Sequence, residues 1–298
     1  MDDTLCGQFD FVRKYLPDEL SKEAEFELND NESFKKYCPI TDSGKNECNN
    51  DLDNFTAGFL WLLGECYSES TKKIYNENTI NAFFLYMISW FSNKLKQKSI
   101  YNTTSLNDFY DTHVKNNDKY NSFTDPAYKI SELKKFMDDR NDFLNINIED
   151  LSKFYDVFNL LCKMHGNVTQ NQKDDTLSNN AIDFVKKYQE LNKVYGIIGE
   201  KPYNKIFSTL STDYNNLKDK CTNCSSLPEI TAKISALRSG YTSSSSIGNR
   251  LFTVLSIFGA IAFFLGISYK YSLFGFRKRF QKQKLREKIK NIKKKMNR

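Results

Sequence analysis

The sequence predicts an all-α protein, in which a helical globular ectodomain precedes one C-terminal transmembrane helix and a basic cytoplasmic tail. Three observations support this prediction. Apolar residues recur at spacings of three and four along most of the chain. The 298 residues include only five prolines and twelve glycines, which favours long helices over a turn-rich sheet protein. An uncharged apolar stretch lies near the C-terminus. We therefore expect a helical body (1–236), a Ser/Gly-rich stalk (237–250), a transmembrane helix (251–273) and a basic tail (274–298).

Stripes of apolar residues predict the helices of the body and the faces that they bury. Phe9, Val12 and Leu16 share one such face near the N-terminus. Similar stripes run through residues 130–137, 148–162, 182–194 and 206–217. Two apolar runs, 57–64 and 82–91, are too short to cross a bilayer and predict central core helices. No alternating pattern typical of a strand competes with these stripes.

Residues 251–269, LFTVLSIFGAIAFFLGISY, predict the membrane span itself. At about 1.5 Å per residue the segment is about 28 Å long, close to the thickness of the hydrocarbon layer. Eleven of its nineteen residues are Leu, Ile, Phe or Val, and together they favour insertion by about 5 kcal/mol. Tyr269 and Tyr271 lie at the end of the span, where aromatic rings prefer the interface. These flanks argue against the alternative of a buried core helix.

The distribution of charge predicts the orientation of this span. Residues 270–298 carry 13 Lys and Arg and one acidic residue, whereas residues 1–269 carry 30 basic and 36 acidic residues. The positive-inside rule then places the tail in the cytoplasm, against anionic lipid, and the body on the other side. A nuclear or RNA-binding tail is the weaker alternative, and the acidic body argues against a nucleic-acid partner. The basic residues that flank the anchor are Arg250, Lys270, Arg277, Lys278 and Arg279.

Seven cysteines predict disulfides if the body faces an oxidising space. Cys38 and Cys48 flank a loop with Pro, Gly and Asn and form a plausible pair, while the other pairings stay open. The Cys221-x-x-Cys224 motif also admits a redox or zinc site, but it lacks a second ligand pair and a βαβ context. We favour structural disulfides and expect no metal. The candidate disulfide cysteines are Cys6, Cys38, Cys48, Cys66, Cys221 and Cys224.

The sequence predicts no catalytic or cofactor site. Cys162 and His165 lie one helical turn apart and could pair as nucleophile and base, but neither an orienting partner nor an oxyanion hole accompanies them. The standard motifs for phosphate, dinucleotide and zinc binding and for hydrolases are absent. We therefore expect no enzymatic activity, no cofactor and no small-molecule substrate.

Several short sequences, spread over nearly the whole chain, occur together in one known family. They are LCG (5–7), VRKYLPDEL (12–20), FLWLL (59–63), NAFFL (81–85), LNDFY (106–110), NINIEDL (145–151) and, most specifically, LGISYKYSLFGFRKR (265–279). In these residues the chain resembles the Plasmodium interspersed repeat (PIR) proteins, the Cir/Yir/Bir variant antigens of rodent malaria parasites. An acidic N-terminus without an apolar leader, and the lack of an RxLx[EQD] export motif, are also typical of that family.

The resemblance implies a multigene antigen on, or exported towards, the surface of the infected red cell, with roles in immune evasion and adhesion. Our preferred hypothesis is a single-pass protein of the infected red-cell membrane, parasite surface or parasitophorous vacuole. Its partners would be the lipid bilayer and a host receptor or antibody, met by loops such as 39–53 and 169–179. The alternative is an intracellular membrane-anchored trafficking or scaffold protein whose body faces the cytosol.

Overall fold

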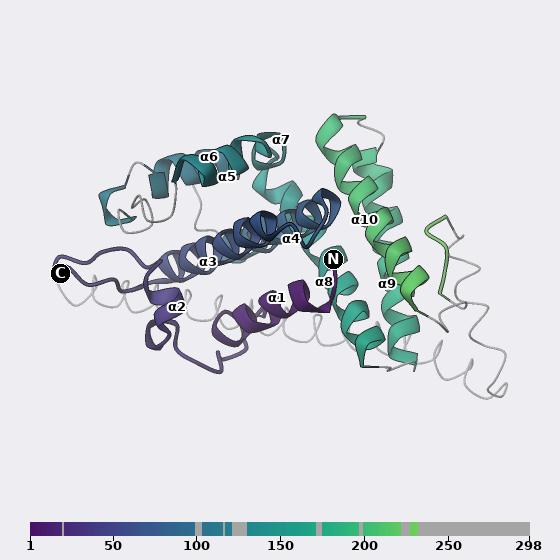
Figure 1. Cartoon of the computed structure of the whole chain (residues 1–298), viewed down its shortest axis with the longest axis horizontal. Coiled ribbons are helices and arrows are strands. Elements are labelled where there is room, and N and C mark those ends of the chain that lie inside the picture. Colours follow the sequence, from purple (N-terminus) through teal and green to yellow (C-terminus); the bar gives the residue numbers. More distant parts are fainter. Residues whose placement is uncertain are drawn as a thin grey trace, which may run out of the picture. The chain divides into compact units, whose positions relative to one another are not determined.

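A computed structural model (Figure 1) describes most of the N-terminal body of the chain. Met1–Leu237 form one compact unit and Arg238–Arg298 a second, and all described residues belong to the first. The predictions of a stalk, a transmembrane helix and a tail, with their flanking basic residues, therefore lie outside the described part. The described residues are 1–19, 21–98, 103–115, 117–120, 130–170, 175–196, 199–221 and 227–231.

The described part of the body is all-helical, as predicted, and contains isolated bridges but no named strand. None of its helices is both long and apolar enough to cross a bilayer. Its α-helices are α1 (Asp3–Tyr15), α2 (Glu32–Lys35), α3 (Asp51–Lys72), α4 (Glu77–Lys98), α5 (Leu106–Phe109), α6 (Ile130–Asp138), α7 (Asn141–Leu144), α8 (Ile148–Thr169), α9 (Asp175–Leu191) and α10 (Lys201–Lys220). Shorter 3-10 or π-helical turns are η1 (Leu28–Asp30), η2 (Tyr110–Lys115), η3 (Asp118–Tyr120) and η5 (Asn192–Gly196).

Helix α4 is the centre of the body. Every residue from 80 to 92 is buried, so this helix is covered on all sides, as expected of a helix that is apolar around its circumference. It packs most extensively on α8 and α3, and α3 and α4 run side by side in Figure 1. Phe59 of α3 stacks on Phe91 of α4 with ring centroids 4.4 Å apart. The prediction that runs 57–64 and 82–91 form central core helices is thus confirmed.

Helix α8 carries the stripe that the sequence predicted, and it connects α4 to the last helices. Ile148, Leu151 and Phe154 are fully buried on it, as are the later members of the stripe. Helix α8 packs on α9 as well as on α4. Phe154 meets Phe207 of α10 at 5.6 Å between ring centroids. The body therefore has one continuous core that extends from α3 through α4 and α8 to α9 and α10.

Local sequence explains where several helices begin and how closely two of them pack. The side chains of Asn50 and Asn147 accept backbone N–H groups at the starts of α3 and α8, which satisfies donors that a helix leaves unpaired. Gly58 on α3 lies against α1 and α4: a Cβ there would come within 2.7 Å of Leu16 and 3.0 Å of Trp90. A side chain at this position would force the side chains of Leu16 and Trp90 to shift.

Two described disulfides connect segments of this core. Cys38 and Cys48 are joined, which is the pair suggested from the sequence. Cys6 of α1 is joined to Cys162 of α8, a residue left out of the candidate cysteines, across 156 positions of sequence. The candidate Cys66 is free and buried on α3, so its prediction as a disulfide cysteine was wrong. Cys221 is disulfide-bonded, and Cys224 lies outside the described residues.

Two details of the predicted helices differ from the structure. The stripe through 182–194 included Val194, which is 58% exposed. Helix α9 ends at Leu191 and the π-turn η5 follows, so the helical phase changes before this residue. The expected polar loop 169–179 is also shorter than predicted, because α8 continues to Thr169 and α9 begins at Asp175.

Removal of the Cys6–Cys162 disulfide is expected to destabilise the body more than removal of Cys38–Cys48. The first bond closes a much longer loop than the second, with separations of 156 and 10 residues. Loop-closure entropy gives about 5 kcal/mol for the longer loop and about 3 kcal/mol for the shorter one. Urea unfolding of the two paired Cys→Ser variants would measure this order, and equal losses would contradict it.

Candidate functional site

The Cys162–His165 pair is not a nucleophile and base in this structure. Cys162 is in a disulfide and has no thiolate to offer. His165 is buried, with its Nε2 3.7 Å from Oδ1 of Asp213, a carboxylate that also binds the Met1 ammonium group. The other histidine, His113, packs against Phe109 with tilted rings whose centroids are 4.7 Å apart. Within the described ranges, no cluster of three or more His, Cys, Asp or Glu side chains could hold a metal ion.

A buried polar cluster forms where α1, α4 and α8 meet. Arg13 of α1 donates to Oδ2 of Asp18 at 2.8 Å and to Oδ1 of Asn159 at 3.0 Å. It also donates to the hydroxyls of Tyr86 and Tyr155. Burial raises the pKa of both tyrosines, so their hydroxyl groups stay neutral. The cluster pairs the half-buried charge of Arg13 at the edge of the core and fixes the end of α1 against α4 and α8.

The same end of α4 holds the segment that follows α1. Lys94 is only 1% exposed, and its ammonium donates to the backbone oxygen of Pro17 and lies 4.0 Å from Oδ1 of Asp18. Gln97 donates to the backbone oxygen of Asp18 at 3.0 Å. Burial lowers the pKa of Lys94 to about 8, against the attraction of Asp18. Two side chains of α4 thus anchor residues 17 and 18, and the chain leaves the core from there.

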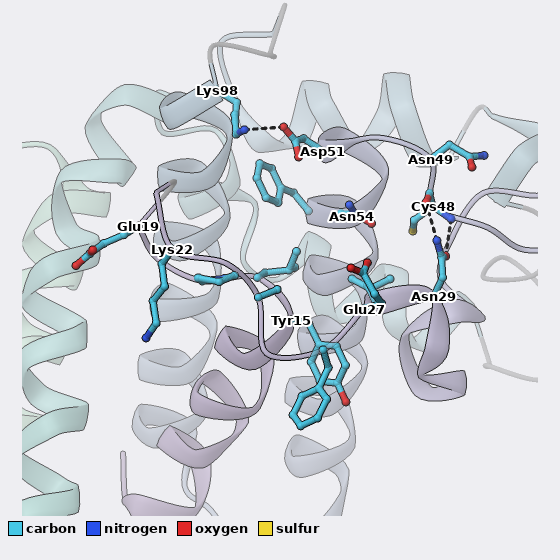
Figure 2. A pocket seen from close by; sticks show the side chains of 16 residues that line it. Tyr15, Glu19, Lys22, Glu27, Asn29, Cys48, Asn49, Asp51, Asn54 and Lys98 are labelled. Carbon is cyan, nitrogen blue, oxygen red and sulfur yellow. Dashed lines mark hydrogen bonds and ion pairs between the residues drawn. The ribbon is translucent and has the colours of Figure 1, made fainter.

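This exit forms the wall of a cavity of about 300 Å³, which we call the strap cavity (Figure 2). The strap itself is residues 19–30, and the N-terminal turn of α3 with Lys98 of α4 forms the facing wall. Lys98 binds Asp51 at 2.8 Å, and Asn29 is hydrogen-bonded to the backbone of Cys48. Figure 2 shows Glu19 and Lys22 at one side of the cavity and the Asn29–Cys48 contact at the other. The lining residues are Tyr15, Leu16, Pro17, Glu19, Lys22, Ala24, Phe26, Glu27, Leu28, Asn29, Cys48, Asn49, Asp51, Asn54, Phe55 and Lys98.

The strap cavity combines aromatic and acidic side chains. Phe26 is 52% exposed, although its ring lies 5.6 Å from that of Tyr15. Glu19 and Glu27 are exposed around it. The exposed ring of Phe26 at the cavity wall, next to Tyr15, is apolar surface that a partner would bury. This makes the strap cavity the strongest candidate binding site among the described residues.

Further cavities lie elsewhere on the described body, and two of them are larger than the strap cavity. One of about 340 Å³ adjoins the Cys38–Cys48 loop, where the N–H of Ile40 donates to the backbone oxygen of Lys119. The other, of about 440 Å³, is lined by polar residues such as Asp142 and by the start of α10 at Lys201. None of the three exposed large apolar side chains, Phe26, Ile74 or Val194, lines either of them. Of these three cavities, the strap cavity is the one lined by a large exposed apolar side chain.

Comparisons with known proteins identify the family to which this chain belongs. The profile described as "Plasmodium variant antigen protein Cir/Yir/Bir" matches residues 6–270. The chain belongs to this Cir/Yir/Bir family. A solved structure, described as that of a Plasmodium PIR protein ectodomain, is similar with a TM-score of 0.53 and 26% sequence identity. The similarity covers 78% of this chain and 99% of the solved chain. No curated protein matches the chain.

The sequence of this Cir/Yir/Bir protein was enough to identify the family, but it did not predict the strap cavity. The quoted sequence VRKYLPDEL contains Arg13 and Asp18, and it ends where the strap begins. Pro17 of this stretch contacts Lys94, which lies almost 80 positions away in the sequence. No local sequence pattern predicts this contact, because it depends on how the helices pack. The one available signal was a run of exposed acidic residues around a single phenylalanine, with five acidic residues and one lysine between positions 19 and 30.

We expect Lys94 to add to the stability of the folded Cir/Yir/Bir protein as the pH rises from about 8 to about 10, measured as the difference between the wild-type protein and a Lys94→Met variant. Its pKa is about 8 in the fold and higher in the unfolded chain. In this window the unfolded state binds more protons, so raising the pH favours the folded state, by roughly 1–3 kcal/mol. Urea unfolding across the window, with Lys94→Met as the control, measures this increment. A parallel increase in the variant would contradict the assignment.

Proposed function

We propose that this protein is a non-enzymatic antigen displayed on a membrane, with its helical body outside and its basic tail in the cytoplasm. The body would take part in immune evasion by binding a host receptor or antibody. Membership of the variant antigen family supports this role. The anchor is the apolar segment at 251–273, with the basic flank that follows it. We place the protein at the infected red-cell membrane or the parasite surface or vacuole.

The observation that carries this proposal is the buried Cys6–Cys162 disulfide. It joins the first helix to α8 inside the core. The packing of the core therefore includes an oxidised cysteine pair, and the bond is not a peripheral surface feature. Disulfides form and persist in secretory and extracellular spaces, and are rare in a reducing cytosol. This supports a body on the external side of the membrane over the alternative of a trafficking or scaffold protein whose body faces the cytosol.

Protease treatment of intact infected cells tests the orientation directly. We expect trypsin to degrade the body, which is rich in Lys and Arg, while an epitope tag on the C-terminal tail stays protected by the membrane. Immunoblotting for both ends before and after permeabilisation gives the readout, and permeabilised cells are the control in which both ends are cut. A body that survives in intact cells would refute surface exposure.

Thiol alkylation separates the proposal from the cytosolic alternative. In native extract we expect no labelling of Cys66, because the side chain is buried and burial raises its pKa to about 12. In denaturant without reductant, a maleimide reagent should label Cys66, and the band shift should disappear in Cys66→Ala. Mass spectrometry should find Cys6, Cys38, Cys48 and Cys162 unlabelled. Labelling of these four would favour the cytosolic alternative.

A further inference from the structure

We propose that the strap cavity is the docking site for a cationic segment of a partner protein, which inserts an aromatic or aliphatic side chain between Phe26, Tyr15 and Phe55. This inference deepens the proposed function and rests on it for two points: the body is displayed where host proteins reach it, and the basic tail lies on the other side of the membrane. The chemistry of the partner comes from the cavity itself.

The size and the aromatic lining of the cavity fit one inserted side chain. Its volume of about 300 Å³ is at the lower end for small-molecule pockets, which is ample for a single anchor residue. Phe26 exposes 52% of its surface at the mouth, Tyr15 is half-buried beside it, and Phe55 is buried against the core. Covering Phe26 would remove apolar surface from water, and central aromatic residues of this kind dominate the affinity of many interfaces.

The charges around the cavity select a basic partner. The strap, residues 19–30, carries five acidic residues and only one lysine, Lys22. Glu19 and Glu27 line the cavity, and Glu23 and Glu25 are exposed between them. Lys98, the second cation at the cavity, is already bound to Asp51 and does not offset the others. Such a surface attracts cationic segments and repels acidic ones, which sets both the rate of encounter and the choice of partner.

The strap is held in place before any partner binds. The N–H groups of Glu25 and Phe26 donate to the backbone oxygen of Lys14 at 2.8 and 3.2 Å. At one end of the strap Gln97 holds residue 18, and at the other Asn29 bonds to the backbone of Cys48 at 2.9 Å. A surface whose backbone is already fixed loses less conformational entropy on binding. Phe26 is therefore presented in a defined position rather than on a free loop.

Charge also decides between possible occupants. A second copy of the body would bring another acidic surface, because residues 1–269 carry 36 acidic and 30 basic side chains. The chain's own basic tail has the right charge, but the proposed topology places it across the membrane from the body. A cationic segment of a different protein meets both the charge and the accessibility requirements.

Binding of a designed peptide to the full-length protein in detergent tests this inference. The probe is a fluorescent peptide with Lys and Arg around one Trp, compared with a version that has Glu in place of the basic residues. We expect anisotropy to report binding of the basic probe alone, weakened when salt rises from about 50 to about 200 mM. Phe26→Ser should weaken binding at least about 10-fold, as expected for a central aromatic anchor.

Matched variants separate the site from general effects. Ile74→Ser removes another exposed apolar side chain, one that is 73% exposed and away from the cavity. The double change Glu19→Gln/Glu27→Gln should weaken binding and its salt dependence. Asp183→Asn/Glu190→Gln alters the net charge equally on exposed positions of α9 and should not. Circular dichroism checks that every variant is folded.

Three outcomes would overturn the inference. The first is equal binding of the basic and acidic probes, and the second is an equal effect of Phe26→Ser and Ile74→Ser. The third is a wild-type dimer in sedimentation that Phe26→Ser abolishes, which would assign the cavity to a second copy of the chain. Protease accessibility on cells is measured independently of peptide binding, so failure of the peptide to bind leaves the proposed orientation standing.

Discussion

Complete burial of residues 80–92 of α4 is the constraint on which the rest of the body depends. Beyond this stretch the helix still holds a buried lysine, Lys94, and the half-buried Gln97 near its end. The Lys94 ammonium and the Gln97 amide nitrogen need acceptors, and the backbone oxygens of residues 17 and 18 supply them. The packing of the core therefore determines where the chain leaves α1, and with it the position of the strap and its cavity.

Several charged side chains of the described body are paired within the fold and stabilise it. Arg13 joins three helices, Asp213 is bound by the Met1 ammonium, and Asp150 accepts hydrogen bonds from Tyr195 and Tyr203. Each of these charges has its partners within the fold, as buried charges require. The strap differs, because its carboxylates lie at the surface around an exposed aromatic ring. The paired charges belong to the rigid scaffold of this antigen-family protein, whereas the strap offers a surface to partners.

Local sequence patterns predicted the helices. They could not predict the features that depend on long-range packing. Burial of the stripe on α8 and of the runs on α3 and α4 followed from periodicity alone. The spacing of Cys38 and Cys48 was short enough to suggest their bond, whereas Cys6–Cys162 depends on how α1 meets α8. From the sequence alone, Lys94 would be expected at the surface. Its burial depends on a loop that only the folded chain places over it.

The unpaired Cys66 has a consequence for the order in which the protein matures. An odd number of cysteines leaves one thiol that can attack any disulfide formed early, and exchange continues as long as that thiol is accessible. Cys66 lies on α3 with its sulfur 3.9 Å from the backbone oxygen of Ile80 on α4. Closure of the α3–α4 hairpin removes it from exchange. Early assembly of this hairpin would therefore protect the disulfides from exchange with the Cys66 thiol.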